Sequence, residues 1–204
     1  MSEIMETIIE RRSIRKFKPE QLTKEHLDTI MLAGSYAPSA GGGQSPVFVA
    51  CQNTELNEEL GQLNVEVMKQ VQAELNAEVV KKLKAALNES EEQKERPKPP
   101  EINNAFYGAP TVVTFFAPKG WYNFTVDCCL AAQNMALAAH TLGVGSCVIA
   151  RAPEVFATKR GLELQQEWGL DDTYEAKLHL ILGYPDGAAM EAKPRRDGQV
   201  IVIA

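Results

Sequence analysis

The chain has 204 residues, of which 45% are hydrophobic, and it carries a formal net charge of −6. This length and composition suit one globular domain with a substantial core. The acidic balance excludes a general polyanion binder, because nucleic-acid affinity depends on a broad cationic surface that releases counterions.

Two further features exclude a membrane protein and a metal site. The first residues, MSEIMETIIE, are too acidic and too interrupted for a signal peptide, and no apolar run approaches the roughly 20 residues that span a bilayer. The four cysteines form neither a CxxC pair nor a His-Cys spacing suited to a metal. We therefore expect a cytoplasmic protein with buried free thiols, without metal, nucleic-acid or membrane partners.

The N-terminal part predicts two short helices and a strand. Apolar residues recur at helical spacing within 3–12, and this helix ends where the arginines begin. Thr23 can cap a second helix, with Gly34 positioned to stop it. After a glycine-rich loop, VFVAC at 47–51 is β-branched and aromatic enough to form a strand.

The middle of the chain predicts one or two long helices. Between Leu56 and Leu87 an apolar residue recurs at every fourth position. Charged residues and prolines then dominate residues 88–104. We expect that segment to be a solvated excursion or a mobile lid.

The second half is more apolar. TVVTFFA at 111–117 predicts a strand buried on both faces, and VDCCLAAQNMALAAHTLG predicts a central helix that is apolar almost all round. VGSCVIA and AKLHLILGYP predict two further strands, with a helix EVFATKRGL between them, and the last six residues are almost all apolar. We expect a single α+β domain, 1–204, whose terminal strand pairs with a sheet of this subunit or of a partner.

Two cationic clusters could hold a small anion. Arg11, Arg12, Ser13 and Arg15 offer guanidinium donors and a hydroxyl suited to a phosphate dianion, and a second cluster near the C-terminus contains Lys193 and Arg195. The alternative for the first cluster is a solvated helix end, where cations favour the C-terminal dipole.

The loop PSAGGGQSP does not meet the requirements of a phosphate loop. Neither GxxxxGK[ST] nor GxGxxG occurs in the chain. The glycines could instead let the backbone approach a flat group, with Ser39 and Gln44 as polar contacts, or the loop could be a plain flexible turn. Asp127 is most simply a first-turn carboxylate that matches the helix dipole, and the vicinal Cys128 and Cys129 most simply pack.

Five motifs together resemble the nitroreductase family of FMN-dependent oxidoreductases, almost end to end. RRSIRKF resembles its phosphate motif, and APSAGGGQSP its Pro-Ser loop ending in Gln. FYGAPTVVTFFAP resembles its central strand, DCCLAAQNMALAAHTLGVGSC its core helix and following strand, and LGYPDG with KPRR its closing segment. The five occur in the family's order at sensible intervals.

The resemblance implies an α+β nitroreductase-like fold, with a central mixed or antiparallel sheet surrounded by helices and a C-terminal strand exchanged with the partner subunit. It implies a homodimer with two FMN sites at the interface. Lys193 and Arg195 would join the N-terminal cluster at the FMN phosphate and ribityl chain. The residues matching the family's FMN-binding positions are Arg11, Arg12, Ser13, Arg15, Pro38, Ser39, Ala40, Gln44, Asn64, Ile149, Ala150, Lys193 and Arg195.

Within this set, the loop residues Pro38 to Gln44 match positions contributed by the partner subunit, and Asn64 resembles an amide that contacts the flavin pyrimidine. The loop departs from the family pattern PSxxNxQPW: Gly42 replaces Asn, Ser45 replaces Pro and Pro46 replaces Trp. Because of these departures, the resemblance predicts neither a side-chain contact from position 42 nor the detailed shape of the substrate pocket.

The implied activity is ping-pong transfer of electrons from NADH or NADPH through FMN to a nitroaromatic, quinone or similar small acceptor. No protein side chain is assigned as catalytic, because the cofactor carries the chemistry. The alternatives are an enzyme of the same fold with another acceptor, such as a dehalogenase, an enone reductase or a reductase of metal-bound substrates, and a non-catalytic flavin-binding protein. A colourless helical interaction domain is the third alternative.

Overall fold

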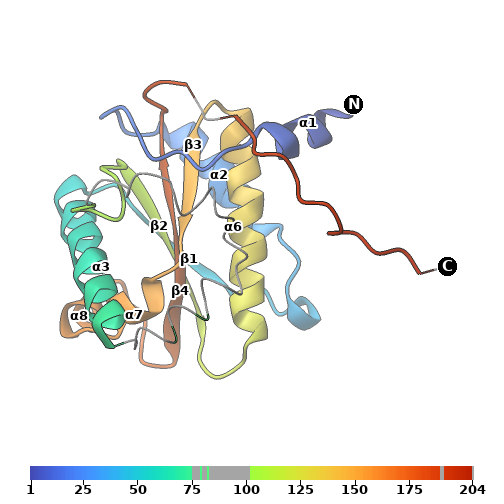
Figure 1. Cartoon of the computed structure of the whole chain (residues 1–204). Helices are drawn as coiled ribbons and strands as arrows, with labels where there is room; N and C mark the ends of the chain where they lie inside the picture. Colours follow the sequence, from blue (N-terminus) through green and yellow to red (C-terminus); the bar gives the residue numbers. More distant parts are fainter. Residues whose placement is uncertain (75–78, 80–81, 83–101, 189–190, 204) are drawn as a thin grey trace.

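An antiparallel sheet with helices on both faces forms the body of the molecule (Figure 1). The computed structural model describes residues 1–74, 79, 82, 102–188 and 191–203. The four named strands pair in the order β1-β2-β4-β3, which confirms the predicted α+β class. They are β1 (Val47–Cys51), β2 (Thr111–Pro118), β3 (Gly145–Ile149) and β4 (Tyr174–Gly183).

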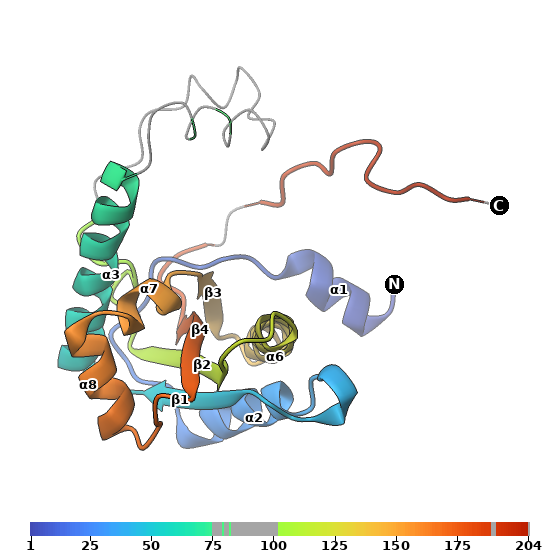
Figure 2. The same ribbon diagram turned by 90° about the horizontal axis from the view of Figure 1, so that it is seen from below.

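The helices form one group on each face of the sheet (Figures 1 and 2). One group consists of α2 (Lys24–Ser35) and α6 (Asn123–Thr141). The other consists of α3 (Thr54–Glu74), α7 (Ala152–Phe156) and α8 (Lys159–Glu167). Beside α6 lies α1 (Glu3–Glu10), and a short 3-10 turn, η1 (Ala40–Gly42), lies in the glycine-rich loop. None of the helices among the described residues is long and apolar enough to cross a bilayer.

Local sequence signals explain several element boundaries. The Thr23 hydroxyl accepts a hydrogen bond from the backbone N–H of His26 at 3.2 Å, which confirms the predicted cap of α2. Gly34 is buried near the end of this helix, where a Cβ would lie 2.1 Å from Met135 of α6. The small residue therefore lets the two helices approach each other closely.

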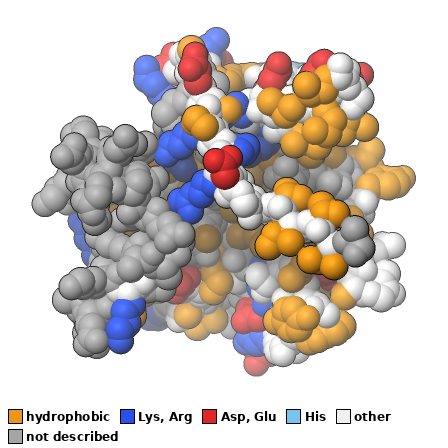
Figure 3. Space-filling view, turned by 45° about the vertical axis from the view of Figure 1, so that its right-hand side comes forward, with side chains coloured by type: hydrophobic (Ala, Val, Ile, Leu, Met, Phe, Trp, Pro, Cys, Tyr) orange, Lys and Arg blue, Asp and Glu red, His pale blue; other side chains and the backbone are white. Residues whose placement is uncertain are grey.

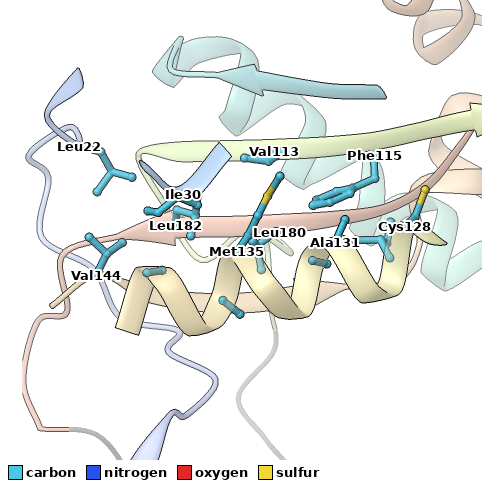
Figure 4. Packing of buried hydrophobic residues seen from close by; sticks show 14 of the residues in the cluster. Leu22, Ile30, Val113, Phe115, Cys128, Ala131, Met135, Val144, Leu180 and Leu182 are labelled. Atoms are coloured by element: carbon cyan, nitrogen blue, oxygen red, sulfur yellow. The ribbon is translucent and has the colours of Figure 1, made fainter. Parts of the chain in front are cut away.

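The core has two parts, one on each side of the sheet. In the first, Met135 and Ala131 of α6 pack against Phe115 and Leu180 of the sheet (Figure 4). This helix is covered by the sheet, α2 and α1, which accounts for its apolar residues on almost every side. In the second part, apolar residues of α3, α7 and α8 cover the opposite face of β2 and β4.

Two predictions about elements need correction. EVFATKRGL forms parts of two helices, because Thr158 caps a second one by accepting a hydrogen bond from Gly161 N–H at 3.1 Å. The central helix begins at Asn123, so Asp127 lies beyond its first turn. The described apolar C-terminal residues form no strand within this chain, and Ile203 is 89% exposed, so the pairing of this segment with a partner's sheet stays a prediction.

The prediction of long helices between Leu56 and Leu87 is confirmed over the described part, which is α3. Apart from Val79 and Lys82, the rest of that prediction and most of the charged segment 88–104 lie outside the described residues.

Candidate functional site

The cationic segment runs along the edge of β3. Ser13 forms a parallel bridge with Ser146, and the backbone N–H of Ile14 donates to the Ser146 carbonyl at 2.9 Å. Gly145 makes this approach possible, because a Cβ there would lie 2.9 Å from the Ile14 side chain. The segment is therefore extended and is held by the sheet after α1 ends.

The two ends of this segment have different environments. Ser13 and Arg15 line a cavity of about 230 Å³ together with Ile14, Lys16, Asp186, Gly187 and Ala188. The Arg12 guanidinium instead donates to the carbonyls of Ile9 and Arg11, both at 2.6 Å. For Arg12 the structure thus shows the alternative role at a helix end, whereas Ser13 and Arg15 face open space.

Three of the predicted residues meet in a second pocket. Asn64 comes from α3, and Ile149 and Ala150 come from the end of β3. The cavity has a volume of about 380 Å³. Its remaining lining is mostly apolar and consists of Val65, Met68, Ile102, Ala105, Tyr107, Val148, Arg151 and Glu154.

The buried amide nitrogen of Asn64 is a hydrogen-bond donor without an acceptor among the described residues. The side chain is 2% exposed, and its Nδ2 has no hydrogen-bond partner among the described residues. An unsatisfied buried donor costs about 1 to 3 kcal/mol, so a bound acceptor would be stabilised here. A ligand of this pocket should therefore present a hydrogen-bond acceptor to Asn64 and apolar surface to the rest of the lining.

Tyr107 connects the two pockets and was not predicted from the sequence. It lines the larger pocket, and its ring lies 5.8 Å from the guanidinium carbon of Arg15, which lines the smaller one. Its φ of 55° is unusual for a residue with a side chain. Asn104 supports this turn, because its Oδ1 accepts from Phe106 N–H at 2.7 Å and its carbonyl accepts from Tyr107 N–H at 3.2 Å.

The available sequence signal for Tyr107 was the pair Tyr-Gly immediately before a buried strand. Gly108 also has a positive φ, of 69°. Two consecutive left-handed residues mark a sharp turn, and strained backbone is frequent at binding sites.

The predicted loop residues lie elsewhere in this chain. Pro38, Ser39 and Gln44 line a separate cavity of about 120 Å³ between α2 and α6, and Ala40 begins η1. Asp127 borders the same cavity, is 3% exposed and accepts hydrogen bonds from this loop. The predicted role of Asp127 at the helix dipole is therefore wrong, because the carboxylate is buried against another segment.

Lys193 and Arg195 belong to a tail that projects away from the body (Figures 1 and 2). The Arg195 guanidinium donates to the Lys193 carbonyl, at 2.6 Å from one terminal nitrogen. Neither residue lines the pocket of Ser13 and Arg15 in this chain. Figure 3 shows hydrophobic side chains in several separate patches, with Lys and Arg side chains between them near the centre of this face.

Two buried side chains, Cys128 and His179, favour their neutral forms. Burial raises the pKa of the Cys128 thiol to about 12, so no reactive thiolate forms there near neutral pH. Burial lowers the pKa of His179 to about 3, and its Nδ1 lies 2.9 Å from the Thr114 hydroxyl. All four cysteines are free, but the prediction that they are buried is confirmed only for Cys128 and Cys147, since Cys51 is half-buried and Cys129 is exposed. Among the described residues, no group of three or more His, Cys, Asp or Glu side chains could hold a metal ion.

Comparisons with known proteins place this arrangement in a family. Residues 8–184 match the sequence profile of the nitroreductase family. An NADPH-flavin oxidoreductase from Vibrio harveyi is 28% identical over 202 residues, which are 99% of this chain and 73% of that protein.

Solved structures show the same fold. A nitroreductase with bound FMN from Bacteroides fragilis NCTC 9343 is 27% identical, with a TM-score of 0.78 and 100% coverage of both chains. A nitroreductase with bound FMN from Desulfitobacterium hafniense DCB-2 is 24% identical, with a TM-score of 0.77 over 99% of each chain. The profile match covers the cationic segment, the pocket of Asn64 and the whole sheet, so the chain belongs to the nitroreductase family.

Proposed function

We propose that the chain is an FMN-dependent oxidoreductase that passes electrons from NADH or NADPH to a small acceptor such as a nitroaromatic or a quinone. The observation that carries this proposal is the buried Asn64 Nδ2, which has no hydrogen-bond partner among the described residues and belongs to a largely apolar pocket beside Ile149 and Ala150. A flavin ring is flat and apolar on its faces and presents carbonyl acceptors at its pyrimidine edge. The oxidoreductase of Vibrio harveyi and the FMN-bound relatives support the same assignment.

The residues present fit such a group. Ser13 and Arg15 would bind its phosphate end, with Arg11 and Arg12 preceding them on the same segment. The Asn64 amide would donate to the pyrimidine edge, and the backbone of Ile149 and Ala150 would lie against the ring. Bound FMN would supply the group that accepts a hydride and releases electrons to the acceptor. The buried Asn64 amide would favour negative charge on that ring, because preorganised donors act strongly in a site that excludes water.

The pocket also supports the proposed kinetic order. Its lining, which includes Met68, Ile102 and Val148, is mostly apolar. We infer that one flat ligand at a time would lie over the ring. The nicotinamide would have to leave before the acceptor enters. We therefore expect ping-pong kinetics with a broad choice of acceptors.

A homodimer completes the proposal. Ile4, Ile8 and Ile9 of α1 are 71%, 45% and 46% exposed, and α1 and α6 border an apolar groove of about 240 Å³. The tail residues from Val200 to Ile203 are 80% to 89% exposed. Apolar surface of this extent is stabilised by a second copy. Exchange of the tails would bring Lys193 and Arg195 to the partner's flavin. Association of the two bodies would bring the loop from Pro38 to Gln44 there.

The free thiols support a cytoplasmic location. All four cysteines are free, including the exposed Cys129, which is the usual state in a reducing environment. This supports a cytoplasmic location within the same proposal.

One spectroscopic experiment separates the alternatives. Purified protein should be yellow, should bleach anaerobically with NADH or NADPH, and should be reoxidised by nitroaromatics or quinones. A yellow protein that neither nicotinamide bleaches would instead be a flavin-binding protein without this activity. A reduced protein that reacts only with haloaromatic or enone acceptors would be a related enzyme, and a colourless protein with no affinity for added FMN would contradict the proposal.

A second experiment tests the dimer. Light scattering should give twice the chain mass for the full protein, and a chain that ends at residue 192 should lose both dimer stability and FMN. A full-length monomer that binds FMN as tightly as its relatives would contradict the shared site.

A further inference from the structure

A buried carboxylate joins the glycine-rich loop Pro38–Pro46 to α6. Asp127 is 3% exposed, and its Oδ1 accepts a hydrogen bond from the backbone N–H of Ala40 at 3.0 Å. Its Oδ2 accepts one from the Ser45 hydroxyl at 2.8 Å. A carboxylate removed from water is stable only where donors replace its hydration. Both donors belong to the loop, so the conformation of the loop and the burial of Asp127 depend on each other.

The loop between these two contacts is exposed and strained. Gly41 and Gly42 have φ values of 60° and 68°, and Gln44 has a φ of 48°, which side-chain-bearing residues rarely adopt. Residues 41–44 are exposed, and a Cβ at Gly41 or Gly42 would touch nothing. Core packing therefore does not hold this stretch in place.

Hydrogen bonds hold it instead. Within the loop, the Ser39 hydroxyl accepts from Gln44 N–H at 2.9 Å and the Ser39 carbonyl accepts from Gly42 N–H at 3.0 Å. Three consecutive glycines carry a large conformational entropy in the absence of such restraints. The two bonds to Asp127 anchor the loop at Ala40 and Ser45, on either side of the glycines, to a rigid helix.

The identity of residue 45 explains why the loop needs the hydrogen bonds to Asp127. The family pattern that the loop resembles has proline there, and proline restricts the backbone covalently. Serine lacks that restraint, but its hydroxyl reaches the buried carboxylate. In this chain the hydrogen bond from Ser45 to Asp127 therefore restrains the loop at the position where the family pattern has a proline ring.

We propose that Asp127, with Ser45 as its partner, is a positioning residue that holds the Pro38–Pro46 loop in the conformation with which it contacts flavin in the partner subunit. The contact with flavin rests on the proposed function. The restraint on the loop rests on the hydrogen bonds within one chain.

The test compares five variants of the full chain. Asp127→Ala removes both bonds, Ser45→Ala removes one and keeps the carboxylate, and the double variant completes a cycle. Asp127→Asn is the conservative variant, because its amide oxygen can accept from Ala40 N–H and its amide nitrogen can donate to the Ser45 oxygen. Asp172→Ala removes an exposed carboxylate outside the loop and is the matched control.

Two measurements are made on each variant: amide hydrogen exchange of residues 40–44 after flavin removal, and FMN affinity from the quenching of flavin fluorescence. Hydrogen bonds to charged groups are strong, so we expect Asp127→Ala and Ser45→Ala each to accelerate exchange and weaken FMN binding about tenfold or more. Asp127→Asn and Asp172→Ala should stay within about threefold of the parent. In the Asp127→Ala background, Ser45→Ala should change the exchange rates and the FMN affinity little further, because the two residues share one interaction.

Wild-type FMN affinity in Asp127→Ala and Ser45→Ala would overturn the proposal. A loss of affinity in Asp127→Asn equal to that in Asp127→Ala would also overturn it, since the carboxylate's charge would then be the requirement. Should Asp127→Ala fail to fold, Ser45→Ala decides alone. Should the parent protein bind no FMN, the proposed function fails, while the exchange rates still decide whether Asp127 holds the loop.

Discussion

The guanidinium carbon of Arg15 lies 5.8 Å from the centroid of the Tyr107 ring. This contact joins the extended segment beside β3 to the strained turn before β2. Arg15 lines the smaller pocket and Tyr107 the larger one, so the pair stands at the boundary between them. A ligand with a phosphate at one end and a flat ring at the other would cross this boundary.

The ring of Tyr107 should therefore orient the Arg15 guanidinium. We expect Tyr107→Leu to weaken FMN binding about two- to fivefold, because a cation-π contact at a partly exposed site contributes about 0.5 to 1 kcal/mol. Tyr107→Phe keeps the ring and should keep the affinity. Fluorescence titration of both variants measures the effect, and equal losses in the two would assign the role to the hydroxyl instead.

Asn64 should contribute to binding and not to the stability of the flavin-free protein. Asn64→Leu removes a buried donor without a partner among the described residues, so the free energy of unfolding of the flavin-free protein should stay equal or rise. FMN affinity should fall about tenfold, since a hydrogen bond to the ring is lost. Urea unfolding and flavin titration measure the two quantities. The exposed Gln62→Ala on the same helix is the control, and a variant that loses stability but keeps its flavin would contradict this role.

Gly145 should be required for the position of the cationic segment. In Gly145→Ala the new Cβ would lie 2.9 Å from the branched Ile14 side chain, which must then move away from β3. We expect the free energy of unfolding to fall by about 1 to 3 kcal/mol, with weaker retention of FMN. Ser146→Ala keeps the backbone atoms that bond Ile14 and is the comparison. Unchanged FMN retention in Gly145→Ala would show that the segment tolerates this movement.

His179 should make folding sensitive to acid. Burial lowers its pKa to about 3 from 6.5, so the unfolded chain binds a proton between these values while the folded chain does not. The contribution of His179 to the free energy of unfolding is constant above pH 6.5. Below pH 6.5 the free energy of unfolding falls as the pH decreases. The slope reaches at most about 1.4 kcal/mol per pH unit. Urea unfolding at pH values from about 7 to 5 should show a shallower loss in His179→Gln than in the parent. Equal slopes would mean that His179 does not contribute.

The sequence predicted the elements that depend on local signals. Thr23 caps α2 through a residue three positions away, and the mainly apolar run of β2, which does not alternate with polar positions, indicates burial on both faces. The residues Asn64, Ile149 and Ala150 were identified by resemblance, and the structure places all three at one pocket. Such predictions succeed because neighbours in the chain, or a family pattern along it, contain the necessary information.

Only the tertiary structure determined the contacts of Asp127, Tyr107 and Arg12. The donors to Asp127 lie 82 and 87 positions away in the chain, and no local pattern distinguishes this carboxylate from one that faces water at a helix end. The Tyr107 ring contacts Arg15 because of the turn before β2, whereas the Arg12 guanidinium donates to the carbonyls at the end of α1. Hydrogen bonds and ring contacts depend on distances of a few ångströms, which the packing of helices on both faces of the sheet determines.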